Sequence, residues 1–282
     1  MSRSPLILLP ATFGAGVHGG AQGRSVEADI TARLGRGYVR IGALLVPPTG
    51  IAQTLHRYAH PLICENDSQE FPYSIRGTNT ALYLGGRYFF AFCRHQIDGY
   101  DPSKVTFFPR AAGGTEQIGG GTAHIIERHA SNEGEEFLDV VGWEVNPEKY
   151  EMPNPAAEFF PVVAEDCWPN NTGGGLIAYG VPSGLQAYEP ADDQPGSKPT
   201  IAFRTVVVSG RHMRASHAAS FHEAKMIRTG QFPVDGMSGG PVFHIGRDAR
   251  GPFIGLAGMI MRAGEDRFHF IETTFLRQLG ST

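Results

Sequence analysis

The sequence has few cysteines, no long hydrophobic run and little net charge. Three cysteines occur in 282 residues (Cys64, Cys93 and Cys167), and this odd, sparse count argues against a disulfide framework and favours a reducing compartment. No continuous apolar run approaches the roughly 18 residues that span a bilayer. The net charge of −4 gives no reason to expect nucleic acid as a partner.

The first residues also lack the pattern of a secretory signal. They are basic with a short apolar patch, and Pro10 interrupts that patch before it reaches the ~7–15 residues of a secretory core. Together with the cysteine count, this predicts a cytoplasmic location and no membrane partner.

Glycine and proline, by contrast, are abundant. The 37 glycines and 20 prolines are typical of many short strands joined by turns, and helical periodicity is scarce. At this length, with 41% hydrophobic residues, the chain can bury a sizeable core as one large domain or two small lobes. The composition therefore predicts a mostly β protein.

The most informative stretch is 235–243, DGMSGGPVF, which places one hydroxyl inside a run of glycines. A serine is a weak nucleophile unless a base removes its proton and the resulting oxyanion is stabilised. Glycines let backbone N–H groups turn inward, so Gly236 and Ser238 are the expected oxyanion donors. Taken alone, the stretch also fits a surface turn before a strand.

Two further groups could complete such a site. The β-prone runs 77–84 and 87–93 are joined by Gly-Gly and predict a hairpin, so His95 follows the end of a buried strand. Asp139 lies in the apolar stretch 136–145, where an unpaired carboxylate costs several kcal/mol. It needs a partner, and a histidine N–H is suitable; the alternative is a solvated aspartate before an edge strand.

Histidine, aspartate and serine in this order match the chymotrypsin-type triad. From about Phe71 to Gly280 the chain resembles bacterial-type members of the trypsin-like (chymotrypsin-fold) serine peptidases. The resemblance is carried by the hairpin and CRH at 93–95, by DVVGWEV at 139–145, by GMSGGPVF at 236–243, and by the segments 252–261, 268–271 and 273–279.

The resemblance implies an all-β, mainly antiparallel fold with two six-stranded β-barrel lobes of chymotrypsin type. The expected organisation is an N-terminal extension of uncertain structure over 1–70 and a peptidase domain over 71–280. Within that domain we expect the first barrel at about 71–160, the second at about 161–270, and a short C-terminal helix at about 273–280.

The resemblance also implies a mechanism. His95 would remove the proton from Ser238 as it attacks a peptide carbonyl, Asp139 would orient the imidazole, and the Gly236 and Ser238 amides would bind the oxyanion. An acyl-enzyme forms and water releases it. The expected partner is a protein or peptide substrate, and no metal or organic cofactor is required.

Substrate contacts are expected from the nucleophile loop and from the strand at 252–261. Phe232, six residues before the serine, occupies the position at the base of the primary specificity pocket, where cleavage after Lys or Arg needs a buried carboxylate. Gly258, Met259 and Ile260 are expected to line the cleft. These residues favour a small or medium apolar side chain before the scissile bond.

Control of activity and alternative functions remain open at the level of sequence. Met237 stands where many secreted zymogens carry an aspartate, which argues against activation by insertion of a new N-terminus. Control by residues 1–70 or by a regulatory protein partner is the resulting hypothesis.

Three other functions are weighed against a peptidase. The same fold could serve as a binding or scaffold module with a silent triad, although all three residues are present. A non-peptidase acyl hydrolase is disfavoured because the chain lacks a Gly-x-Ser-x-Gly elbow between strand and helix. Cys93 is expected to be a free buried cysteine rather than a nucleophile.

Overall fold

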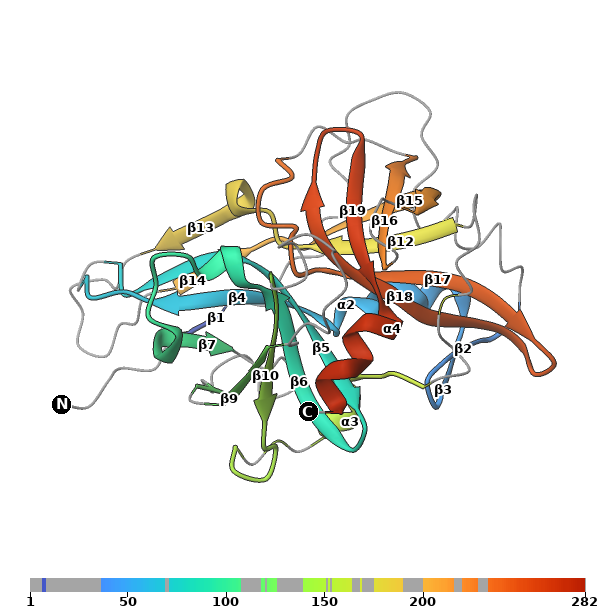
Figure 1. Ribbon diagram of the computed structural model, residues 1–282, viewed down its shortest axis with the longest axis horizontal. Coiled ribbons are helices and arrows are strands. Elements are labelled where there is room, and N and C mark those ends of the chain that lie inside the picture. Colours follow the sequence, from blue (N-terminus) through green and yellow to red (C-terminus); the bar gives the residue numbers. More distant parts are fainter. Residues whose placement is uncertain are drawn as a thin grey trace, which may run out of the picture.

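The computed structural model of the protein (Figure 1) describes most of the chain beyond residue 36. The described residues are 7–8, 37–68, 71–107, 118–119, 121–125, 139–150, 152, 154–163, 168, 175–189, 200–215, 220–227 and 233–281. Most strand pairs within them are antiparallel, so the prediction of a mainly antiparallel all-β fold is confirmed.

The second lobe is a closed barrel of six antiparallel strands. Strand β17 pairs with both β12 and β18, and this double pairing closes the barrel. In spatial order the strands are β17 (Pro241–Asp248), β12 (Gly175–Gly180), β15 (Val206–Ala215), β16 (Phe221–Met226), β19 (Arg267–Glu272) and β18 (Gly251–Ala263). Closure leaves no free edge inside this ring.

The first lobe is a half-barrel, not the six-stranded barrel expected. Among the described residues its outermost strands, β8 and β9, do not pair with each other. The order is β8 (Ile118–Gly119), β7 (Val105–Phe107), β4 (Ala59–Glu65), β5 (Tyr73–Leu84), β6 (Arg87–Cys93), β10 (Val140–Val145) and β9 (Thr122–Ile125), with β11 (Phe160–Pro161) parallel to β5.

The β5–β6 hairpin confirms the Gly-Gly prediction and shows its cause. Gly85 and Gly86 have φ angles of 57° and 87°. A two-residue turn with positive φ at both positions matches the right-handed twist of the flanking strands, and glycine adopts it without a Cβ penalty.

Residues 37–65, which the sequence assigns to an N-terminal extension, pair with strands of both lobes. β2 (Val39–Ile41) pairs with β18 of the second lobe, and β4 pairs with β5 of the first. Between them lie β3 (Leu44–Val46), η1 (Pro48–Gly50) and α2 (Ile51–His56). These pairings join residues far apart in sequence, so a local pattern does not reveal them.

A third, small sheet and several short helices complete the described structure. In the sheet, β14 (Thr200–Phe203) lies between β1 (Ile7–Leu8) and β13 (Gln186–Glu189). The helices are η2 (Arg94–Ile97), η3 (Pro102–Lys104), α3 (Pro155–Glu158), η6 (Ser183–Leu185), α4 (Thr273–Leu276) and η7 (Arg277–Gly280). The expected C-terminal helix thus consists of α4 and η7.

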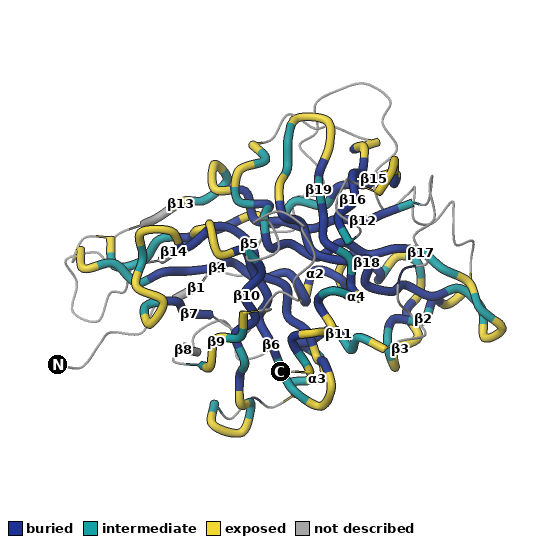
Figure 2. The backbone as a smooth tube through the Cα atoms, in the orientation of Figure 1, coloured by how far each residue is buried: buried dark blue, intermediate teal, exposed yellow. Residues whose placement is uncertain are grey.

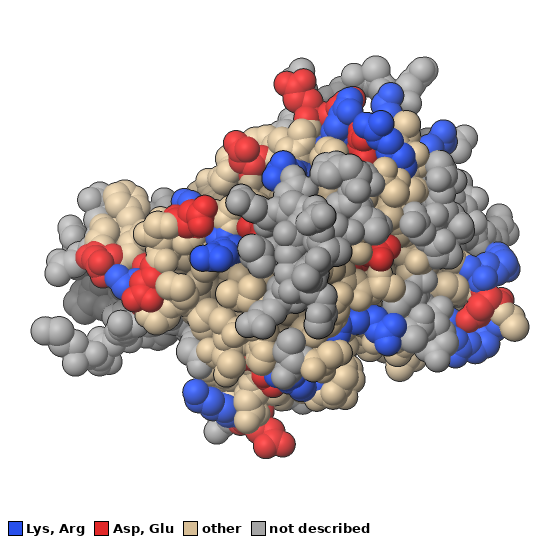
Figure 3. All heavy atoms as spheres, in the orientation of Figure 1, with Lys and Arg blue, Asp and Glu red and all other residues tan. Residues whose placement is uncertain are grey.

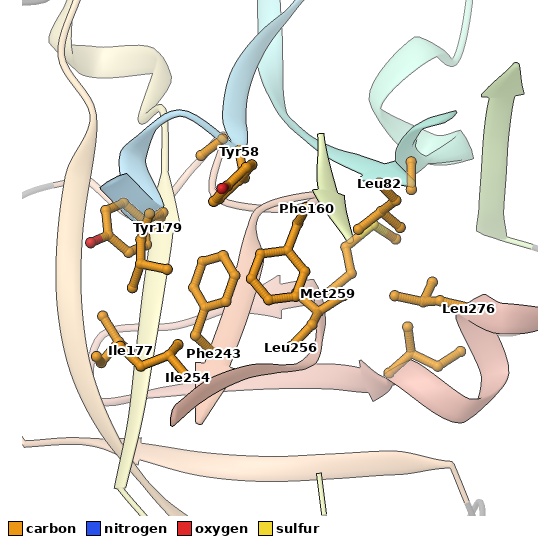
Figure 4. Packing of buried hydrophobic residues seen from close by; sticks show 14 of the residues in the cluster. Tyr58, Leu82, Phe160, Ile177, Tyr179, Phe243, Ile254, Leu256, Met259 and Leu276 are labelled. Carbon is orange, nitrogen blue, oxygen red and sulfur yellow. The ribbon is translucent and has the colours of Figure 1, made fainter. Parts of the chain in front are cut away.

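One hydrophobic core joins the two lobes (Figure 4), and the strands that contribute to it are buried along much of their length (Figure 2). The ring of Phe160 packs edge-on against Tyr58 of the first lobe, with centroids 5.2 Å apart, and lies 5.3 Å from Phe243 of the second. Leu276 of the C-terminal helix is fully buried in the same core. Buried side chains from both lobes therefore pack into one continuous core.

The surface shown in Figure 3 carries charges of both signs. Arg and Lys gather over the β15–β16 region, and Arg211 and Lys225 of these strands are register partners. In the same region Glu223 forms ion pairs with Arg214 and Arg267, which offsets part of this charge. No helix in the described part of the chain is long and apolar enough to cross a membrane.

Candidate active site

His95 and Asp139 meet because β6 and β10 are paired neighbours. Val140 is the register partner of Cys93, so the residue before β10 lies beside the turn η2 that follows β6. One Asp139 oxygen accepts the His95 backbone N–H at 2.8 Å, and the other lies 2.6 Å from His95 Nδ1. The carboxylate thus fixes both the main chain and the ring of the histidine.

This pair is accessible from solvent. The His95 side chain is 44% exposed and that of Asp139 is 23% exposed. A hydrogen bond from Nδ1–H to the carboxylate leaves Nε2 as the ring nitrogen that can accept a proton. The arrangement suits a general base with a fixed tautomer.

The Ser238 hydroxyl lies in the second lobe, in the turn before β17. Its Oγ donates to the carbonyl oxygen of Met261 at 3.0 Å. The structure describes both Ser238 and His95, and no hydrogen bond joins them. The structure thus brings His95 and Asp139 together, whereas Ser238 needs a rotation about its Cα–Cβ bond to leave the Met261 carbonyl.

Two backbone amides beside this hydroxyl have no acceptor among the described residues. The amides of Met237, Gly239 and Gly240 donate to Val234, Ile260 and Met237 respectively. The amides of Gly236 and Ser238 donate to nothing in the described part of the chain. These are the two residues that the sequence predicted as oxyanion donors.

The orientation of these amides follows from the planarity of the peptide unit, in which C=O and N–H point in opposite directions. The Asp235 carbonyl accepts the Ser183 N–H at 2.8 Å, which fixes the peptide unit that carries the Gly236 N–H. The Met237 carbonyl accepts the Gly240 N–H at 3.0 Å, which fixes the unit that carries the Ser238 N–H. Both free N–H groups therefore point away from these anchors.

Two glycines of the loop combine a positive φ with close contact to the backbone of another segment. Gly236 has a φ of 89°, and a Cβ there would lie 2.6 Å from the Val181 carbonyl oxygen. Gly239 has a φ of 81°, and a Cβ there would lie 2.1 Å from the Thr78 carbonyl oxygen. Backbone from elsewhere approaches too closely for any other residue at these positions.

Three first-lobe side chains hold carbonyls of the loop 235–240 around Ser238, and the sequence did not predict any of the three. Thr78 Oγ1 donates to the Gly236 oxygen at 2.7 Å, and Thr80 Oγ1 donates to the Gly239 oxygen at 2.7 Å. Gln96 Nε2 donates to the Ser238 oxygen at 2.8 Å. The one available signal was Thr78 and Thr80 at i and i+2 in an apolar strand, since buried hydroxyls need partners.

The residues expected to line the cleft stay a prediction, and the structure shows how deeply the described ones lie. Met259 is fully buried in the core shared by the two lobes and Ile260 in a core of the second lobe, and a Cβ on Gly258 would lie 1.9 Å from the Ile271 oxygen. The strand first becomes exposed at Arg262, just after the bulge in its pairing with β19. Phe232 lies outside the described residues.

Cys93 is the remaining reactive group near the pair. The ligand atoms of Cys93, His95 and Asp139 lie within 4.8 Å of one another, a spacing that a metal ion could use. Burial raises the pKa of the Cys93 thiol well above its ordinary value, and the charge of Asp139 adds to the effect. A thiol that stays protonated is a poor metal ligand and a poor nucleophile, so the arrangement favours a hydrogen-bonded His–Asp pair.

The barrel architecture is compatible with a chymotrypsin-like fold. No family model matches the sequence, and no curated protein matches it. The chain is similar to a solved structure from work on aromatic interactions in the coupled folding and binding of the intrinsically disordered Sesbania mosaic virus VPg protein. That match has a TM-score of 0.41 and 12% identity, and covers 78% of this chain and 94% of the other. A likeness at this level carries no argument about function.

Proposed function

We propose that the protein is a serine endopeptidase. The observation that supports this most directly combines the His95–Asp139 pair with the amides of Gly236 and Ser238. These two amides have no acceptor among the described residues and lie in the loop that carries the candidate nucleophile. A base, its orienting acid and an oxyanion site are the three requirements of acyl transfer by a hydroxyl.

In the proposed reaction, Ser238 Oγ releases the Met261 carbonyl, turns to His95 and attacks a substrate carbonyl carbon. His95 Nε2 takes the hydroxyl proton, and the Gly236 and Ser238 N–H groups bind the oxyanion of the tetrahedral intermediate. His95 then gives the proton to the leaving amine as the peptide bond breaks, and an acyl-enzyme results. Water, deprotonated by His95, attacks the ester and restores Ser238.

The finer properties of this enzyme are also proposals. We propose a protein or peptide substrate, a cytoplasmic location, and control by a conformational change or a regulatory protein partner. The hydrogen bond from Ser238 to Met261 is compatible with such control, because it engages the hydroxyl proton that the base would take.

The same hydrogen bond favours a second candidate function, a binding or scaffold protein whose triad is silent. In that case Ser238 stays on the Met261 carbonyl whatever partner binds. The two candidates differ in whether the hydroxyl can become nucleophilic.

Labelling with a fluorophosphonate distinguishes the two candidates. The wild type and the Ser238→Ala variant are treated with the probe, and the adduct is located by peptide mapping; Ser103→Ala, at an exposed serine, is the matched control. A peptidase gives an adduct confined to Ser238 that Ser103→Ala retains. If the folded wild type carries no adduct at Ser238 in the presence of candidate substrates, the peptidase proposal fails and the scaffold is favoured.

A further inference from the structure

Gln96, the residue after His95, has a buried side-chain amide with every hydrogen-bonding group in use. Its Oε1 accepts the Cys93 N–H at 2.7 Å, and its Nε2 donates to the Thr78 oxygen at 3.0 Å and the Ser238 oxygen at 2.8 Å. The residue is 4% exposed. A buried amide has two N–H donors, and here each has one carbonyl, one in each lobe.

The space around this amide is matched to it by two glycines. A Cβ at Gly77 would lie 2.4 Å from Gln96 Nε2, and a Cβ at Gly239 would lie 2.8 Å from Gln96 Oε1. Both glycines have positive φ, 138° and 81°. Gln96 therefore fills a slot between a strand of the first lobe and the nucleophile loop, where any larger neighbour would displace it.

The main chain of Gln96 is held as firmly as its side chain. Arg76 Nε donates to the Gln96 carbonyl at 3.1 Å, and the Arg76 guanidinium lies over the ring of Tyr100. On the opposite side, the Ser238 oxygen that Gln96 holds also accepts the Thr78 N–H at 3.2 Å. One residue thus ties the turn that carries the base to the main chain of the nucleophile.

We propose that Gln96 is a positioning residue that sets the distance between His95 and Ser238 across the two lobes. This inference rests on the proposed function, since it names how that site is assembled. Gln96 holds the Ser238 carbonyl from the same turn that carries His95, so it links the main chain of the nucleophile to that of the base. Without the amide, the loop loses its direct side-chain bond to the residue beside the base.

The test measures how strongly His95 influences the side chain at position 238, and it requires no substrate. In a Ser238→Cys protein, an imidazole within reach lowers the pKa of the introduced thiol below the ~8.5 of free cysteine. The pKa is read from the pH dependence of alkylation by iodoacetamide, with the adduct located by peptide mapping. The same profile is then measured after adding Gln96→Met, which keeps the shape but removes the amide.

Gln96→Met is expected to raise the pKa of the introduced thiol towards the free value, and to slow its alkylation at pH 6.5 by about tenfold. Gln96→Glu adds a pH signature: its carboxylate faces two carbonyl oxygens, whereas its protonated form regains one donor. This variant is made in the protein that keeps the native Ser238. Its rate of fluorophosphonate labelling should fall by about 100-fold above the pKa of the introduced carboxyl group and partly recover below that pKa.

Asn79→Leu is the matched control, because Asn79 is a buried amide on the adjacent strand whose Nδ2 donates to the Pro61 oxygen, away from the nucleophile loop. Thermal unfolding confirms that each variant is folded. An equal thiol pKa with and without Gln96→Met, or an equal rise in Asn79→Leu, overturns the inference. If the thiol pKa depends on Gln96, the positioning role of Gln96 is supported. That conclusion holds even if Ser238 of the wild type does not react with the fluorophosphonate, because the lack of reaction counts only against the peptidase function.

Discussion

The two halves of the candidate active site are built in different ways. His95 and Asp139 are partly exposed side chains at the ends of neighbouring strands, and each holds the other. The Ser238 half is mainly backbone, with its peptide units oriented by side chains of the opposite lobe. The first half therefore depends on side-chain chemistry, whereas the second depends on the completed fold.

The largest expected effect comes from the side-chain half. Asp139→Asn keeps the size of the side chain but removes the charge and favours the wrong histidine tautomer. If the proposed function holds, the rate of acylation of Ser238 should fall by about 10⁴-fold with little change in thermal stability. Stopped-flow or gel-based fluorophosphonate kinetics and a melting curve measure both quantities.

The control for this substitution is Asp98→Asn, an exposed aspartate close to His95 in sequence, which should keep the wild-type rate. A fall of less than tenfold in Asp139→Asn would show that the observed pair does not orient a working base.

The backbone half should respond mainly through stability. Gly239→Ala places a Cβ against the Thr78 oxygen in addition to the strain of positive φ, so unfolding free energy should fall by about 3 kcal/mol, with loss of labelling. Gly86 has a φ of 87°, but nothing lies within 4 Å of a Cβ added there. Gly86→Ala should therefore lower the unfolding free energy by only about 1 kcal/mol. Urea unfolding compares the two; equal losses would mean that the close approach of the lobes is unimportant.

The smallest effect is expected at the far end of the strands that carry His95 and Asp139. The Arg87 guanidinium, with help from His124, lowers the pKa of Glu144 from 4.5 to about 2. Because the folded-state pKa is depressed, this stabilisation is present above about pH 4.5 and is lost as the pH falls through about 2.

Glu144→Gln should therefore lower the unfolding free energy by about 1 kcal/mol near neutral pH. The difference from wild type should vanish towards pH 2, and labelling of Ser238 should be unchanged. Urea titrations at several pH values measure it. A difference that stayed constant down to pH 2 would assign the effect to packing and not to the ion pair.

The sequence predicted those features that depend on local residues. The Gly85–Gly86 turn, the strand leading to His95 and the approach of Asp139 all follow from short patterns and from the cost of burying a carboxylate. The mostly β character followed from the glycine and proline content, and the antiparallel fold with a closed second barrel followed from the family resemblance.

The features it missed all depend on pairings between distant residues. β2 has three residues and pairs with β18 more than 200 positions later, so no local pattern indicates that pairing. The role of Gln96 requires knowledge of which carbonyls surround it.

The core shared by the two lobes affects how the protein unfolds. The contact chain from Tyr58 through Phe160 to Phe243 crosses between the lobes, so separating them exposes aromatic surface on both sides. The lobes should then melt as one cooperative unit, with a single calorimetric transition and similar hydrogen-exchange protection on β5 and β17. A rigid hinge opening is correspondingly costly, so a signal that switches the site would have to act through its loops.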